Sequence, residues 1–220
     1  MRKRVSAFRL ATICAVFAIA ACAGPSVYFR DTNAPWRGQT ERACLAQDLS
    51  FLNATLEQLP RLDGPRSCGA AAPFKLHAVS GGTIQLKPAP TLRCPMISPT
   101  VQWLEMVVQP AAQRHLGQPI TEVKVAASYS CRPMNNRRGA KLSEHGFANA
   151  LDVSGFTLAD GSKITLLRGY NGSRNEQAFW REIEKGACGR YQTVLGPRHD
   201  RAHRDHFHFD LMQRSSGPYC

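Results

Sequence analysis

The chain contains 220 residues with a formal net charge of +12, and 43% of its residues are hydrophobic, which suits one domain with a sizeable core. The positive charge comes without a helix-turn-helix, a zinc-finger or a base-stacking pattern, so we expect no binding to DNA or RNA.

The first residues have the composition of an export signal. Basic residues at the start precede an apolar run at residues 10–21, which is shorter than a membrane-spanning helix requires. The run ends in Ile19-Ala20-Ala21-Cys22, which matches the bacterial lipobox and makes Cys22 the lipidated first residue of the mature protein. An ordinary secretion signal cut at an Ala-x-Ala site is the alternative. Because Ala23 rather than Asp follows the cysteine, we expect a lipoprotein of the bacterial cell envelope, anchored in the outer membrane and facing the periplasm.

Behind the signal peptide at residues 1–21, the composition predicts a flexible tether at residues 22–39 and one folded domain at residues 40–220. The signal holds four basic and no acidic residues, so its removal lowers the formal charge from +12 to +8. A basic exported protein meets anionic lipids and anionic cell-wall polymers, and we interpret the charge as attraction to the envelope. The oligomeric state is not predicted.

Cysteine usage agrees with export. Without Cys14 in the signal and Cys22 at the lipid site, an even set remains: Cys44, Cys68, Cys94, Cys131, Cys188 and Cys220. None of them are spaced as Cys-x-x-Cys, so three disulfides are expected in an oxidising compartment. The sequence does not choose among the fifteen possible pairings.

The predicted elements mix helices and strands. A helix is expected from Thr40 until Pro60 stops it, and a second from about Pro99 until Pro110 kinks or ends it. A third helix is expected at residues 175–185. Strands are predicted at residues 74–79, 83–86, 123–128 and 191–195. Helices flanking a small antiparallel sheet make this an α+β fold.

Two further segments carry the chemistry: residues 143–153, with His145 and Asp152, and residues 203–210, with His206 and His208. If the second segment is extended, His206 and His208 point to one face, and Phe207 and Phe209 point to the other. Two imidazoles and one carboxylate leave a zinc ion one coordination position short, and that open position is typical of catalysis. A solvated basic loop is the simpler interpretation of clustered histidines, and the aromatic alternation argues against it.

In the first of these segments, we expect Asp152 to lie on a strand, because Leu151 and Val153 alternate with it. His145 is expected just before that strand. Residues seven apart also share a helix face. Gly146 and the β-branched Val153 make the helix the weaker alternative.

The chain resembles the bacterial extensin-like C-terminal domain proteins over roughly residues 40–212. The resemblance rests on Ser128-Tyr129-Ser130-Cys131-Arg132, Leu142-Ser143-Glu144-His145, Gly155-Phe156-Thr157-Leu158-Ala159-Asp160-Gly161, and Leu195-Gly196-Pro197 with His206-Phe207-His208-Phe209-Asp210-Leu211. That family is similar to the metallopeptidases that include D-Ala-D-Ala peptidases and the hedgehog fold. The similarity implies a disulfide-stabilised fold of that type and a Zn²⁺ site with His145, Asp152 and His208 as ligands.

The same resemblance suggests catalytic residues. Asp205 lies where the peptidase relatives place an acidic base, and its alternative role is to orient a ligand imidazole. Arg132 is expected to stabilise the oxyanion, unless it is a surface arginine beside a disulfide at Cys131. His206 is expected to contact the substrate or support the site. Ser143 and Tyr129 are weaker candidates for peptide contacts, and Asp210 is the more favoured carboxylate behind the ligands.

These features predict an exported zinc metallopeptidase of the D,D- or L,D-type. Its expected substrate is the stem peptides or crosslinks of peptidoglycan. The substrate follows only from the resemblance and the location, and the sequence does not fix which bond is cut. The rival interpretation is a metal-stabilised module that binds the cell wall without turnover.

Overall fold

A computed structural model describes residues 34–49 and 54–220. The predicted signal peptide, the predicted lipid site Cys22 and the predicted tether up to residue 33 lie outside the described residues. Within the described part of the chain, no helix combines the length and the apolar composition that crossing a membrane requires.

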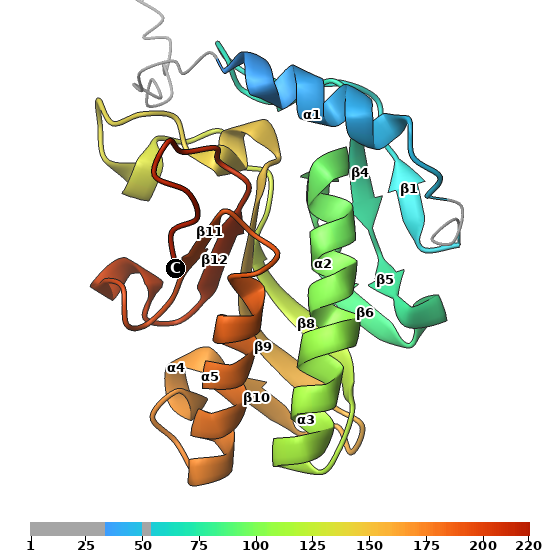
Figure 1. The fold of residues 1–220 in the computed structure, drawn as a ribbon, viewed down its shortest axis with the longest axis vertical. Coiled ribbons are helices and arrows are strands. Elements are labelled where there is room, and N and C mark those ends of the chain that lie inside the picture. The colour runs from blue at the N-terminus through green and yellow to red at the C-terminus, as the bar shows by residue number, and fades with distance from the viewer. Residues whose placement is uncertain (1–33, 50–53) are drawn as a thin grey trace, which may run out of the picture.

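The largest sheet runs in the order β11-β12-β9-β8-β6-β5, with β10 paired to β9 (Figure 1). Its strands are β5 (Ala78–Val79), β6 (Ile84–Lys87), β8 (Ile120–Ala127), β9 (Ala150–Leu158), β10 (Lys163–Thr165), β11 (Thr193–Leu195) and β12 (Phe207–Asp210). All pairs are antiparallel except β6 with β8. The mixed α+β class predicted from the sequence is confirmed.

Two smaller sheets and a helix complete the N-terminal half. They are a sheet of β1 (Leu56–Gln58), β4 (Pro73–Leu76) and β7 (Thr91–Arg93), a hairpin of β2 (Leu62–Asp63) and β3 (Gly69–Ala70), and α1 (Pro35–Leu45). A disulfide between Cys44 and Cys94 ties α1 to the segment that follows β7.

Three helical segments lie across one face of the large sheet in Figure 1: α2 (Ile97–Trp103), α3 (Gln109–Leu116) and α5 (Arg174–Ala187). A short α4 (Leu166–Gly169) precedes α5. Trp103 of α2 packs edge-on to Phe209 of β12, and Trp180 of α5 stacks on Phe156 of β9. Fully buried Phe207 and Phe209 face these helices, so His208 between them is directed to the opposite face. The alternation read from the sequence therefore separates an aromatic core from a polar face.

The first predicted helix is wrong at both ends. It begins at Pro35, so residues 35–39, assigned to the tether, are helical, and it ends at Leu45 rather than near Pro60. Proline suits a first helical turn because its missing N–H has no partner there. Leu56, expected on the helix, instead pairs with Leu76 in the β1–β4 ladder. Long-range strand pairing outweighs the local leucine spacing.

The second helix continues past Pro110, where the sequence predicted a kink or an end. A π-helical turn, Leu104–Val108, joins α2 to α3 without a break. Proline lacks an N–H and clashes with the carbonyl four residues earlier in an α-helix. The wider π turn lies directly before Pro110 and accommodates the proline without ending the helix. The helix ends at Gly117, whose positive φ of 71° forms a left-handed cap.

The remaining predicted elements are present. Strands expected at residues 74–79, 83–86, 123–128 and 191–195 correspond to β4 with β5, β6, β8 and β11. Helix α5 begins with a capping box in which Ser173 and Glu176 satisfy each other's backbone N–H groups. The three expected disulfides join Cys44 to Cys94, Cys68 to Cys131, and Cys188 to Cys220.

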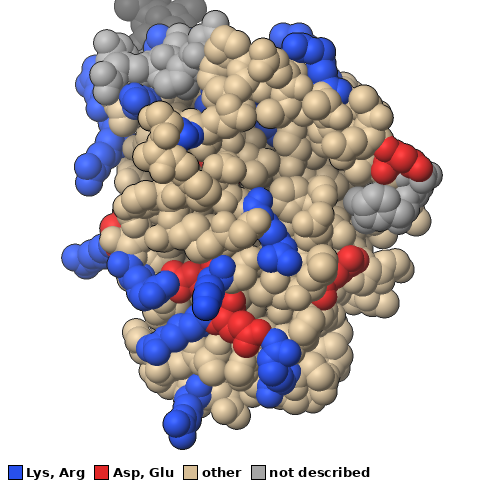
Figure 2. Space-filling model, viewed as in Figure 1, with Lys and Arg blue, Asp and Glu red and all other residues tan. Residues whose placement is uncertain are grey.

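Figure 2 shows how charge is distributed over the face drawn in Figure 1. Lys and Arg side chains gather at the upper left, over the loop between β8 and β9. Lower on the same face, over α5, basic and acidic side chains are interspersed.

Candidate metal centre

The centre of the candidate site is formed by two neighbouring strands and the turn before one of them. Asp152 lies on β9 and His208 on β12, where the two residues are direct partners in the antiparallel register. His145 lies in a short 3₁₀ helix, Glu144–Phe147, which leads into β9. The strand position of Asp152 and the approach position of His145 are as predicted, and all three side chains are buried.

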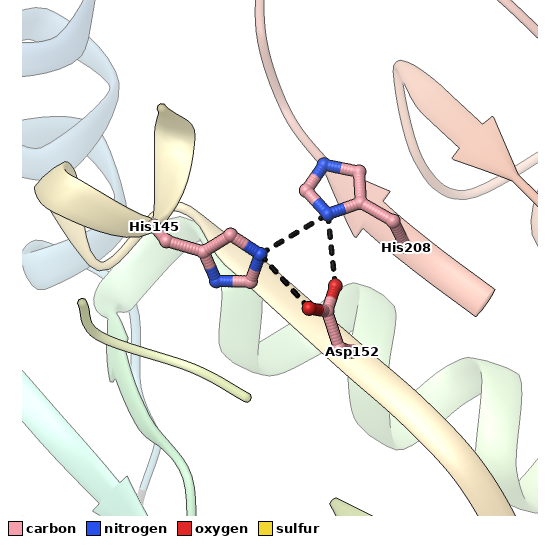
Figure 3. A group of neighbouring side chains, drawn as sticks. All are labelled: His145, Asp152 and His208. Atoms are coloured by element: carbon pink, nitrogen blue, oxygen red, sulfur yellow. Dashed lines mark hydrogen bonds and ion pairs between the residues drawn. The ribbon is translucent and has the colours of Figure 1, made fainter. Parts of the chain in front are cut away.

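The polar atoms of these side chains converge (Figure 3). The Asp152 carboxylate lies between the two imidazoles, with Oδ2 3.2 Å from His145 Nε2 and Oδ1 2.9 Å from His208 Nδ1. The two ring nitrogens are 3.2 Å from each other. One oxygen and two nitrogens thus surround a common point, the donor set of a three-ligand metal site.

The far side of each imidazole is held by a fixed acceptor. His145 Nδ1 lies 2.5 Å from the Ser128 carbonyl oxygen, and His208 Nε2 lies 3.0 Å from Asp210 Oδ2. When the imidazoles are neutral, as metal binding requires, donation of those N–H groups leaves His145 Nε2 and His208 Nδ1 with lone pairs directed at the common point. Asp210 therefore lies behind His208, on the side away from Asp152.

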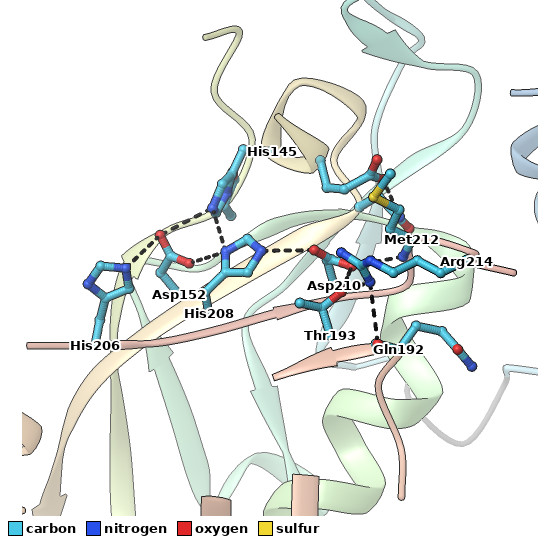
Figure 4. Close-up of polar contacts among 12 residues, drawn as sticks. His145, Asp152, Gln192, Thr193, His206, His208, Asp210, Met212 and Arg214 are labelled. Atoms are coloured by element: carbon cyan, nitrogen blue, oxygen red, sulfur yellow. Dashed lines mark hydrogen bonds and ion pairs between the residues drawn. The ribbon is translucent and has the colours of Figure 1, made fainter. Parts of the chain in front are cut away.

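Asp210 is itself fixed by its neighbours (Figure 4). Its Oδ1 accepts hydrogen bonds from the Thr193 hydroxyl at 2.5 Å and from the Met212 backbone N–H at 2.8 Å. Arg214 in turn contacts the Thr193 hydroxyl. This chain of contacts orients His208 from behind, as partners of metal-binding histidines commonly do.

The electrostatics favour an ionised Asp152 beside a protonated His208. Burial alone would raise the pKa of Asp152, but hydrogen bonds and charge from His145 and His208 outweigh it and hold that pKa well below its usual range. Burial would lower the pKa of His208, yet hydrogen bonds with Asp152 and Asp210 raise it to about 9. The carboxylate is therefore ionised and ready to bind a cation.

The convergent atoms open into a cavity of about 420 Å³. Arg132, Ser143 and His206, all predicted at the site, line this cavity together with the three ligand candidates. His206 Nε2 lies 3.7 Å from Asp152 Oδ2, on the side away from His208 in Figure 4.

Asp205 and Tyr129 are not among the residues that line the cavity. The Asp205 side chain is half exposed, and its Oδ1 lies 2.9 Å from His206 Nδ1. This hydrogen bond lowers the pKa of Asp205. The Tyr129 hydroxyl packs against Gly64 in the β2–β3 turn, so closely that a side chain at Gly64 would collide with it.

The cavity also contains residues to which the sequence assigned no role. His203 and Asp200 form a second histidine–carboxylate pair, with Nδ1 and Oδ1 2.8 Å apart. Lys141 and Arg214 add positive charge to the wall. The spacing of His203 three residues before His206 was the one available signal, whereas nothing local marks Lys141 or Arg214.

The comparison with protein families assigns the chain. The family model described as "Extensin-like protein C-terminus" matches residues 42–220. The chain therefore belongs to the extensin-like C-terminal family, as the motifs predicted. No curated protein and no solved structure matches it.

Proposed function

We propose that this protein is an exported zinc peptidase that hydrolyses amide bonds in the stem peptides or crosslinks of peptidoglycan. One observation carries the proposal: two imidazole nitrogens and one carboxylate converge at a cavity, each imidazole held by an acceptor on its far side. A structural metal site is usually closed by four protein ligands, whereas three ligands beside a cavity leave room for water and substrate.

Zinc suits the donor set because it accepts nitrogen and carboxylate ligands in tetrahedral geometry. Bound zinc supplies Lewis-acid polarisation of a carbonyl and activation of water. The proposed relation to the D-Ala-D-Ala and hedgehog-type peptidases rests on the spacing of His145, Asp152 and the His206-x-His208 pair.

His206 is the group best placed to move protons. Its Nδ1 hydrogen bonds to Asp205, so the carboxylate fixes the tautomer that leaves Nε2 free on the side of Asp152. Nε2 then accepts a proton from attacking water and returns it to the leaving amine. Asp205 is a positioning residue in this scheme, acting through His206 rather than directly as the base.

Arg132 also supports the proposal. Amide hydrolysis passes through a tetrahedral intermediate with a negatively charged oxygen, which a nearby cation stabilises. The Arg132 guanidinium lines the same cavity and has no acidic partner among the described residues. A cation held there stabilises the oxyanion.

Digestion of purified sacculi tests the proposal. We expect the mature protein with zinc to release peptide fragments that carry new amino and carboxyl ends, and a chelator to abolish release. His208→Ala should be inactive, whereas His77→Ala, which removes an exposed histidine between β4 and β5, should be as active as wild type. A zinc-loaded protein that binds sacculi and releases nothing would show a binding module instead of an enzyme.

A further inference from the structure

A hairpin next to the metal centre, residues 131–143, has a regular pairing that the sequence does not reveal. Pro133 forms a bridge with Leu142. The Met134 N–H donates to the Lys141 carbonyl at 2.9 Å, and the Ser143 N–H donates to the Arg132 carbonyl at 3.1 Å. The two arms are thus antiparallel over three residue pairs.

This pairing separates the side chains into two faces. Residues opposite each other in an antiparallel ladder share a face, and neighbours along each arm alternate. Arg132, Met134, Lys141 and Ser143 therefore lie on one face, and all four line the cavity of the metal centre. Pro133 and its partner Leu142 are on the other face and are buried, although Leu142 also borders the cavity.

The base of the hairpin is anchored. Leu142 packs with Phe147 and Cys68 in a small apolar cluster, and a disulfide joins Cys68 to Cys131. Phe147 belongs to the same 3₁₀ helix as the ligand His145. The hairpin and the metal centre therefore share one support, which keeps the cavity face of the hairpin in a constant position.

The charges on that face are unbalanced. Neither Arg132 nor Lys141 has an ion pair or a side-chain hydrogen bond with any residue that the structure describes. The carboxylates that line the cavity are already occupied inside the protein: Asp152 by His145 and His208, Asp210 by His208, Glu144 by Arg37, and Asp200 by His203. None of these described carboxylates is paired with Arg132 or Lys141.

We infer that the cavity face of this hairpin is a binding subsite for a carboxylate of the substrate, close to the bond that the metal centre acts on. The planar guanidinium of Arg132 has five N–H donors, so two of them match a carboxylate with parallel hydrogen bonds while others remain for the oxyanion, and Lys141 adds a point charge. The Ser143 hydroxyl is a further donor on the same face. The inference rests on the proposed function and narrows its substrate to peptides with a free carboxylate flanking the scissile amide.

Two synthetic stem pentapeptides provide the probe, one with free carboxylates and one with the same groups as carboxamides. Calorimetry gives the Kd of each for the zinc-loaded protein, and the KM replaces the Kd if cleavage occurs. We expect the free acid to bind about ten-fold or more tightly, the size of a lost charge-assisted hydrogen bond.

Lys141→Gln should reduce this preference several-fold while zinc content and circular dichroism stay unchanged. Lys124→Gln is the matched control, because Lys124 is exposed on β8 and outside the cavity, and it should keep the wild-type preference. Adding Arg132→Gln to Lys141→Gln should abolish the preference.

Equal affinity of wild type for both peptides would overturn the inference, as would equal losses in Lys141→Gln and Lys124→Gln. Binding of neither peptide at millimolar concentration would also overturn it. The proposed function is judged separately, by release of amine from sacculi. A protein that prefers the free acid without cleaving it retains the subsite and loses the peptidase.

Discussion

The two histidines of the His206-x-His208 pair have different partners although both point away from the aromatic core. His208 is sandwiched between Asp152 and Asp210, whereas His206 contacts Asp205 and only approaches Asp152. A metal-binding imidazole keeps one nitrogen for the metal and donates from the other to a fixed acceptor, as His208 Nε2 does to the buried Asp210. His206 has its acceptor in the half-exposed Asp205, which suits a group that moves protons.

Zinc content should separate these roles. We expect His208→Ala to lose most of its zinc, because one of the three ligands is removed, and His206→Ala to retain most of it. Elemental analysis of the purified mature protein gives the ratio, with about one zinc per wild-type chain. The reverse order would assign His206 as the ligand.

Asp210, which contacts His208, and Asp205, which contacts His206, should likewise differ in their effects on zinc affinity and hydrolysis. Asp210→Asn should weaken zinc affinity by roughly 10–100-fold, as loss of a partner behind a metal ligand does, and activity should return when zinc is raised. Asp205→Asn should keep its zinc and lose roughly 10²–10⁴-fold in hydrolysis that added zinc does not restore. Competition with a chelating dye gives the affinity. Rescue of Asp205→Asn by zinc would place Asp205 behind a ligand.

For single residues, the sequence was informative about the candidate metal ligands and less informative about Asp205, the predicted base. The period of two in Phe207-His208-Phe209 determines which face each side chain takes, so the separation of His208 from the aromatic core was predictable. That His208 would meet Asp152 was implied only by the family resemblance. Asp205 precedes the strand, in a turn where no such period applies. Its direction depends on the competing hydrogen bond to His206, which only the folded structure contains.

Helix α1 lies outside the candidate site but contacts the turn that carries His145. Arg37 on α1 forms a buried ion pair with Glu144, the residue before the ligand His145, and lies over the Phe147 ring at 3.8 Å. Asn149 also donates to Glu144, at 2.6 Å. The helix nearest the tether thus supports the turn that presents His145.

Removing one partner of this pair should be costly. Arg37→Ala leaves the Glu144 charge buried without its cation, and losing one partner of a buried pair costs about 3–5 kcal/mol of unfolding free energy. Urea denaturation measures the loss. The double variant Arg37→Met with Glu144→Gln should recover much of it, because no buried charge remains. Equal stability of Arg37→Ala and wild type would show that water reaches Glu144.

Sequence reasoning misplaced both ends of α1 because its signals are weak. Residues 34–39 contain Pro35 and Gly38, which are typical of a linker, and the buried side chains of the helix include the charged Arg37 and Glu41. Local pattern predicts elements whose apolar spacing agrees with their burial, as in α5. It fails where a helix is held by ion pairs and by the disulfide from Cys44 to Cys94.

For the whole molecule, the predicted lipid anchor places the domain at a membrane. We expect Cys22→Ser to release the protein from the membrane fraction and to abolish labelling by a fatty-acid probe, because stable anchoring depends on acyl chains rather than on surface charge. Ser6→Ala, in the same predicted signal but outside the lipobox, is the control and should stay labelled. An unlabelled wild type would identify an ordinary cleaved signal.

The direct pairing of Asp152 with His208 in the β9–β12 register also bears on how the chain reaches its final state. The two residues are 56 positions apart in sequence, with α5 between them. A chain in which β12 has not yet joined β9 offers no comparable site, so the free energy of metal binding adds to that of sheet completion. A slip of β12 by one residue would turn His208 into the core and Phe207 toward the cavity. Uptake of the proposed metal during refolding should therefore report, in time, when the β9–β12 pairing is made.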